Sequence, residues 1–339
     1  MKKFLVVCVA FVLPLSLVHA QEADDTGAGV GFSIIPRLDF SPEFTSGEHT
    51  LTLGNSSLYT LFEGNITDNL SFSVANHWLG FYSTDGFFDD TKALYQDSWR
   101  SDSNTWLDWA TLTYEVGSFS FTAGKDVLQI GGFEMDANDW EVHPEHNSML
   151  WNVLPAYQWG AKVGYSFDDD NEITFQWTTS PYGERPFSSG LFNYSLGWNG
   201  LLFDRLETIW SVTALQRDKG DFLPVVSLGN MFSVTEALTL GLDAFTAVGD
   251  EEYLLQKGFT VIPSFSWDAS DSISFTGKVG GEYNTETKNR DLVAGVAAYW
   301  YPLQDSHDLR IHAAGGYRHD ARLVTISVGV LYNLNFPRN

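Results

Sequence analysis

The side chains best suited to a chemical role lie in one long connection. From Gly131 to Pro155 the sequence reads GGFEMDANDWEVHPEHNSMLWNVLP, and it contains Glu134, Asp136, Asp139 and Glu141. Carboxylates grouped along a narrow aqueous path attract cations. The same stretch also carries two Trp and two Met, although a solvated loop is usually polar. Two hypotheses follow: the connection folds into a lumen and places these carboxylates at a constriction, or it caps an outer rim.

Enzymatic and metal-binding interpretations find little support in the residues. His143-Pro144-Glu145-His146 has a proline that breaks helical spacing, so it resembles a metal-ligand cluster only loosely. The acidic run 168–172 lacks the glycine and the distal glutamate of a calcium loop, and Asp-rich tight turns are common. No nucleophile elbow, phosphate loop or dinucleotide fingerprint occurs. The sequence therefore predicts a protein that is not an enzyme, with no catalytic residue, cofactor or metal ligand to assign.

The composition excludes further classes. With 44% hydrophobic and 15% aromatic residues, the chain is too apolar to be disordered. A net charge of −24 opposes nucleic-acid binding, which needs a basic face. The single cysteine, Cys8, cannot form a disulfide framework.

Residues 1–20 are typical of a secretory signal peptide. Lys2 and Lys3 precede an apolar run, and Val18-His19-Ala20 forms a small-residue cleavage site before Gln21. The alternative, a membrane anchor, is disfavoured because the run is short and interrupted by Pro14. We expect a short periplasmic segment over 21–28 and one β-barrel over 29–339.

Strict alternation of apolar and small polar residues recurs throughout the rest of the chain. The last example has its apolar positions at Val324, Ile326, Val328, Val330, Tyr332, Leu334 and Phe336. Such a pattern suits a soluble β-sandwich or solenoid, or an outer-membrane barrel. The polar face is mostly Gly, Ser, Thr and Asn rather than long charged residues, and this favours the inside of a closed barrel.

Segments of this kind predict a closed, antiparallel transmembrane barrel of sixteen strands. An even number brings both termini to one side, and short periplasmic turns should alternate with longer extracellular loops. The predicted strands are 30–40, 51–66, 69–81, 105–116, 118–130, 156–167, 171–180, 191–200, 203–216, 221–233, 236–248, 258–268, 272–284, 291–301, 307–319 and 322–336.

Ten ionisable residues share the inward parity of these strands and are candidates to line a pore. Both signs occur, so the set can orient solutes that cross a pore, or it can form solvated pairs with no such role. The candidates are Arg37, Asp39, Lys162, Glu207, Asp243, Lys278, Glu282, Arg310, His312 and Arg318.

Several short motifs resemble those of a known family. They are FTAGK at 121–125, GGFEMD at 131–136, TFQWTTSP at 174–181 and WNG at 198–200, followed by Trp210. In these the chain resembles the phosphate-selective porin O/P-like proteins of Bacteroidetes-type bacteria. The resemblance implies a sixteen-stranded outer-membrane porin, assembled as a homotrimer, that passes small hydrophilic solutes.

Phosphate preference is not expected to carry over from that family. Its phosphate-specific members share a ladder of inward arginines, whereas this chain retains 19 − 2 = 17 Lys and Arg after cleavage of the leader, and its long connection is acidic.

The function expected from the sequence is passive diffusion of small hydrophilic solutes or ions through a water-filled barrel in the bacterial outer membrane. The protein's partners are then membrane lipid and the solutes themselves. The alternative is a plugged surface barrel whose extracellular loops bind a ligand or partner.

Overall fold

The computed structural model describes residues 29–46, 49–52, 56–80, 107–130, 132–136, 147–183, 187–248, 255–303 and 306–336. The expected signal peptide and the segment 21–28 lie outside these residues. Within the described ranges, no helix is both long and apolar enough to cross a membrane. The two short helices are α2 (Phe133–Asp136) and α3 (Met149–Val153).

The strands form a single antiparallel sheet of eighteen segments. Because β2 is a four-residue arm and β17 and β18 continue one another, the sheet has sixteen full strands, as the sequence predicts. The segments are β1 (Val30–Phe44), β2 (His49–Thr52), β3 (Ser57–Thr67), β4 (Leu70–Gly80), β5 (Leu107–Val116), β6 (Phe119–Val127), β7 (Tyr157–Ser166), β8 (Asn171–Thr179), β9 (Phe192–Leu202), β10 (Leu206–Asp218), β11 (Asp221–Thr235), β12 (Leu238–Val248), β13 (Gln256–Ser270), β14 (Ile273–Asn284), β15 (Arg290–Trp300), β16 (Leu309–Arg318), β17 (Leu323–Tyr332) and β18 (Leu334–Phe336).

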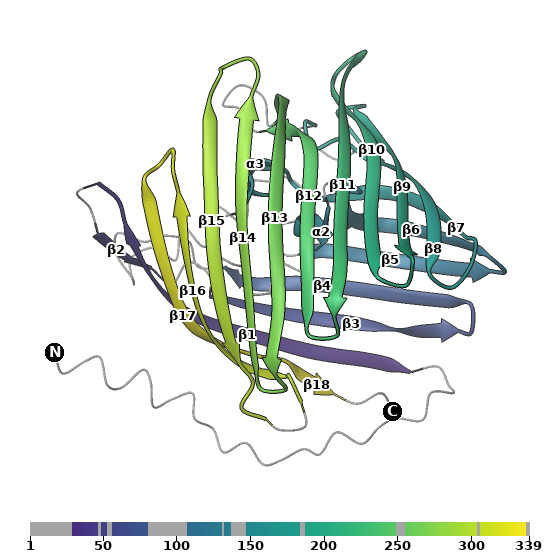
Figure 1. The fold of residues 1–339 in the computed structure, drawn as a ribbon. Coiled ribbons are helices and arrows are strands. Elements are labelled where there is room, and N and C mark those ends of the chain that lie inside the picture. The colour runs from purple at the N-terminus through teal and green to yellow at the C-terminus, as the bar shows by residue number, and fades with distance from the viewer. Residues whose placement is uncertain are drawn as a thin grey trace.

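The sheet closes on its own first strand. Ile34 of β1 lies opposite Thr60 of β3 on one side and opposite Leu334 of β18 on the other. Farther along β1, Phe40 pairs with Val328 of β17. The remaining neighbours follow in chain order, so the strands form a closed ring around α2 and α3 (Figure 1). Closure gives backbone groups at both ends of the sheet a hydrogen-bonding partner.

The strand boundaries differ most from the prediction near the N-terminus. The predicted strand 51–66 is in fact two segments, β2 and β3. The first strand continues past residue 40 to Phe44, and its last residues pair with β2 as a hairpin. Ser56 then lies beside β1, where its hydroxyl accepts a hydrogen bond from the Asp39 amide at 2.8 Å.

Alternation places bulky apolar side chains on the outer face of the ring. Phe121, Phe175 and Leu196 are exposed by 44%, 49% and 56%. Tyr165 and Trp267 lie near the ends of their strands and are also exposed. An apolar wall with amphipathic aromatic rings at its margins is the outer surface that a lipid bilayer requires.

Candidate functional site: an inner belt on the barrel wall

The described parts of the connection between β6 and β7 run along the inside of the barrel. We call its described residues, 128–130, 132–136 and 147–156, the inner belt. Gln129 attaches the beginning of the belt to the inner wall of β8 and β10: its amide N–H donates to Gln176 Oε1 at 2.8 Å, and its carbonyl accepts from Thr213 Oγ1 at 2.7 Å. Gln176 in turn donates to the carbonyl of Val127 at 2.8 Å. The wall residues Gln176 and Thr213 are almost completely buried by this contact.

Glycines on the wall allow the belt to lie flat against it. A Cβ atom on Gly229 of β11 would stand 2.8 Å from Cα of Gly132, and one on Gly132 would stand 2.1 Å from Asp243 Oδ1. On β9, a Cβ at Gly197 would overlap the side chain of Gln129 at 1.6 Å. These positions therefore need glycine for close backbone approach rather than for an unusual φ angle.

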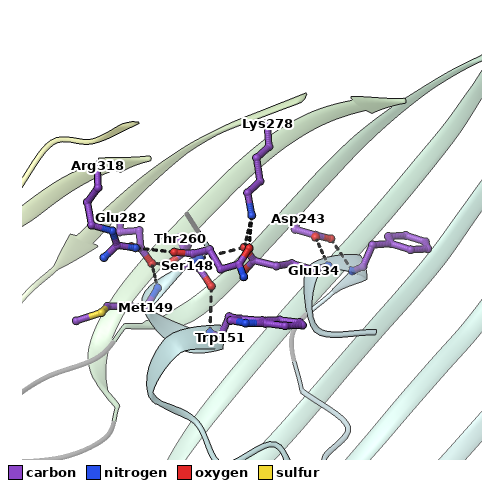
Figure 2. A network of polar contacts seen from close by, with 11 residues as sticks. Glu134, Ser148, Met149, Trp151, Asp243, Thr260, Lys278, Glu282 and Arg318 are labelled. Carbon is purple, nitrogen blue, oxygen red and sulfur yellow. Dashed lines mark hydrogen bonds and ion pairs between the residues drawn. The ribbon is translucent and has the colours of Figure 1, made fainter. Parts of the chain in front are cut away.

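Asp243 of β12 fixes the first helix of the belt. Its two carboxylate oxygens accept hydrogen bonds from the backbone N–H groups of Phe133 (3.0 Å) and Glu134 (2.8 Å), as Figure 2 shows. Asp243 is 7% exposed. Hydrogen bonds to a charged acceptor are stronger than those between neutral groups, so this carboxylate is a principal anchor of α2.

Glu134 and Lys278 connect the two halves of the belt to β14. Glu134 Oε1 accepts from Lys278 Nζ at 3.1 Å and from the Ser148 amide at 3.0 Å. Lys278 Nζ also donates to Asn147 Oδ1 at 2.6 Å. Both members of this ion pair are less than 10% exposed at the side chain. The carboxylate that the sequence assigned to a constriction is therefore neutralised by a lysine of the wall.

A second carboxylate and an arginine fix α3. Glu282 Oε1 accepts from the Met149 amide at 2.8 Å and from Thr260 Oγ1 at 3.2 Å. Arg318 of β16 donates to the carbonyl of Asn147 at 2.5 Å and pairs with Asp291 at 3.3 Å. Four of the inward-parity residues thus engage the belt or its supports, as Figure 2 shows for Asp243, Lys278, Glu282 and Arg318.

Apolar packing accompanies these polar anchors. Belt residues join inward side chains of β10 to β13 in one buried cluster, and each fully buried aliphatic side chain contributes about 1.5–3 kcal/mol. Its members are Leu128, Ile130, Met135, Leu150 and Leu154 of the belt with Leu215, Leu223, Val225, Phe245, Ala247, Leu255 and Ile262. Packing therefore supplies more of the belt's attachment than any single polar anchor.

Tyr182, in the connection between β8 and β9, borders this cluster. Its hydroxyl donates to the carbonyl of Leu255 at 3.1 Å and accepts from the Leu255 amide at 2.9 Å. Burial raises the pKa of Tyr182 to about 12, so the phenol stays neutral at physiological pH. The contact ties together two connections at one end of the barrel.

Three inward-parity residues form a separate group where the barrel closes. Asp39 of β1 accepts from Arg37 Nε at 2.6 Å and contacts His312 Nε2 of β16. The strand β17 lies between them, and a Cβ on its Gly329 would stand 1.7 Å from Asp39 Oδ1. Asp39 and the His312 side chain have no exposed area. This group holds the closing strands together.

The remaining inward-parity residues do not contact the belt through a bond that the structure shows. Lys162 donates to Asp126 at 2.9 Å, and Glu207 is exposed near the start of β10. The guanidinium of Arg310 lies 5.4 Å from the ring centre of Tyr299. Whether any of the ten guides a solute remains a prediction.

Part of the predicted constriction falls outside the described ranges. Asp139 and Glu141 lie there, whereas Asp136 is described and exposed. His143 and His146, considered above as loose candidates for a metal site, also lie outside the described ranges. Within the described ranges, no group of three His, Cys, Asp or Glu side chains is placed to hold a metal ion.

Sequence reasoning missed the belt's backbone partners. Ser148, which accepts from the Trp151 amide at 3.2 Å, and Asn147 are ordinary loop residues by type. Thr260 was on an inward position, but nothing marked it as a partner of Glu282. Contacts between a loop and a wall more than 100 residues away leave no local signal.

Comparison with known proteins identifies the fold. No family model matches the chain, and no curated protein matches it by sequence. Among solved structures, a double mutant of the porin of Rh. blastica aligns with a TM-score of 0.57 at 13% identity, over 89% of this chain and 100% of that one. A loop-deletion mutant of OmpT, an outer membrane protein of Vibrio cholerae, aligns with a TM-score of 0.56 at 10% identity, over 89% and 99%. The chain therefore has a porin-like fold.

Proposed function

We propose that the protein is an outer-membrane porin through which small hydrophilic solutes or ions diffuse passively. The observation that carries this proposal is a closed sixteen-strand ring in which the described residues of the belt lie along the inner wall formed by β8 to β14. A barrel of this strand number generally encloses an aqueous channel. The exposed apolar outer wall supports insertion into lipid.

Differences in exposure between the two sides of the inner wall support an aqueous path beside the belt. On the covered side, Gln176, Ser195 and Thr213 are 0–2% exposed. On β5 and β6, the inward side chains of Thr113 and Thr122 remain partly exposed and bond to each other at 2.9 Å. The polar wall of β5 and β6 is therefore the side along which we expect solutes to pass.

A plugged barrel that binds a partner through its outer loops is the second candidate. The apolar cluster under the belt favours it, because a connection with this much buried surface can also serve as a stopper. The two functions differ in conductance, since a plugged barrel carries little current.

Planar-bilayer recording with the purified, refolded protein tests the proposal. We expect stepwise insertions with the conductance of open channels, and uptake of small sugars by liposomes that contain the protein. Folded protein that inserts without conducting would contradict the porin assignment and favour the plugged barrel. A heat-denatured sample in the same detergent is the control.

The finer assignments rest on the sequence resemblance. We propose that the chain is a relative of the phosphate-selective porin O/P-like proteins, exported by the signal peptide 1–20 and assembled as a homotrimer. Phosphate selectivity is not part of the proposal, because most of the described inward bases pair with carboxylates, namely Arg37, Lys162, Lys278 and Arg318. Light scattering of the detergent-solubilised protein should give three chains per particle, and a single chain would contradict the trimer.

A further inference from the structure

Five carboxylates face the lumen near one end of the barrel, at the turns that join β3 to β4, β5 to β6, β7 to β8, β9 to β10 and β13 to β14; we call this the short-turn end. They come from β3, β5, β8, β10 and β13, and each lies within a few residues of a short turn. The alternation assigns them to the inner face, since Phe62, Tyr114 and Trp267 beside three of them are exposed on the outside. We call this set the mouth ring: Glu63, Glu115, Glu172, Glu207 and Asp268.

Two side chains of the mouth ring accept hydrogen bonds that the structure shows, and both donors are serine hydroxyl groups. Glu172 accepts from Ser120 Oγ at 3.2 Å, and Asp268 accepts from Ser274 Oγ at 2.7 Å. No member forms an ion pair with another described residue, and all except Glu172 are exposed. The inward base at this end is Arg310, the second residue of β16.

Most of the charges that the structure describes deeper in the barrel are paired or buried. Glu134 pairs with Lys278, Asp126 with Lys162, and Asp291 with Arg318. Asp243 and Glu282 are buried under the belt and are directed toward its N–H groups. Asp136 of the belt is also exposed, so among these described carboxylates the ones without an ion pair or an amide partner are Asp136 and the five of the mouth ring.

We propose that the mouth ring makes the pore selective for cations and cationic solutes. This inference rests on the proposed porin function and deepens it. In water, one unit charge about 7 Å from an ion changes the local concentration about 2.7-fold, before screening by salt. Several carboxylates around one mouth act together on every ion that enters, whereas paired charges largely cancel.

Reversal potentials in a tenfold KCl gradient test the ring. We expect a K⁺/Cl⁻ permeability ratio above one for the native protein. Replacing all five ring residues, with Gln for each Glu and Asn for Asp268, should lower that ratio about threefold or more. A matched control removes the same charge from exposed turn residues at the same end: Asp68, Asp169, Asp170, Asp204 and Asp271, each to Asn. It should keep most of the selectivity.

Each outcome decides between the ring and its alternatives. Three results would overturn the ring proposal: a native K⁺/Cl⁻ permeability ratio at or below one, an unchanged ratio in the ring variant, or an equal fall of the ratio in the control. If the channel still conducts in these cases, the porin function stands. Absence of conductance in the folded native protein instead overturns the porin function. Should the fivefold variant not insert, Glu115→Gln with Glu207→Gln is measured in its place, and the ratio should still fall.

Discussion

Removing the carboxylate of Asp243 should loosen the first helix of the belt while the barrel stays folded. Asp243→Ala leaves the buried N–H groups of Phe133 and Glu134 without their acceptor. Each hydrogen bond to a charged group contributes about 1.5–3 kcal/mol, which gives about 3–6 kcal/mol for the pair. Water that enters from the lumen recovers part of this, so we take about 2–4 kcal/mol as the net loss.

Such a loss is measurable as hydrogen exchange. Local opening of α2 should become about 30-fold to 1,000-fold more frequent, because 1.4 kcal/mol corresponds to a factor of ten. Mass spectrometry of peptides covering residues 132–136 should show that acceleration, while peptides from β15 and β16 keep their native rates. The apolar cluster remains in place, so we expect loosening of α2 and not release of the whole belt.

Two comparison variants separate this effect from a general loss of charge. Asp243→Asn keeps one carbonyl oxygen and should show an intermediate rate. Glu207→Ala removes another inward carboxylate that makes no bond to the belt, and should leave the α2 peptides unchanged. Native exchange rates at α2 in Asp243→Ala would refute the conclusion that this carboxylate anchors the belt.

Three further substitutions test other parts of the structure. Gly229→Ala places a Cβ 2.8 Å from Gly132 Cα, so it should displace the belt and increase the current noise of the open channel. Current noise equal to that of the native channel would contradict the close packing. Lys278→Met removes the cation that neutralises Glu134 and should raise the K⁺/Cl⁻ permeability ratio about twofold. Adding Glu134→Gln to the same chain should abolish this increase. Asp39→Ala removes the carboxylate that the buried side chains of Arg37 and His312 contact where the barrel closes, and it should destabilise the barrel by about 3–5 kcal/mol. The loss is measured as a lower temperature of unfolding in detergent, and an unchanged temperature would count against this group as a stabilising contact.

The sequence was sufficient for the barrel because its signal is local. A period of two, repeated over segments of about ten residues, requires one apolar and one polar face, and many such strands in succession favour a closed barrel. Most predicted strand boundaries agree with the structure to within a few residues. The exception, the predicted strand 51–66, lies where β2 forms a hairpin with Ser41–Phe44 at the end of β1.

The position of the belt could not be predicted from the sequence in the same way, although one strand of the wall gives an indication of it. Alternation fails on β11, where Leu223 and Val225 face inward while Phe222 and Val226 face outward, so both faces are apolar. An inner face of this kind is unfavourable in contact with water and must be covered from within the barrel. On β11 the failure of alternation therefore indicates where the belt is attached, whereas the inward side chains of Thr111 and Thr113 on β5 stay partly exposed. By the same reasoning, polar substitution at Val225 should weaken the belt's attachment without disturbing the outer wall.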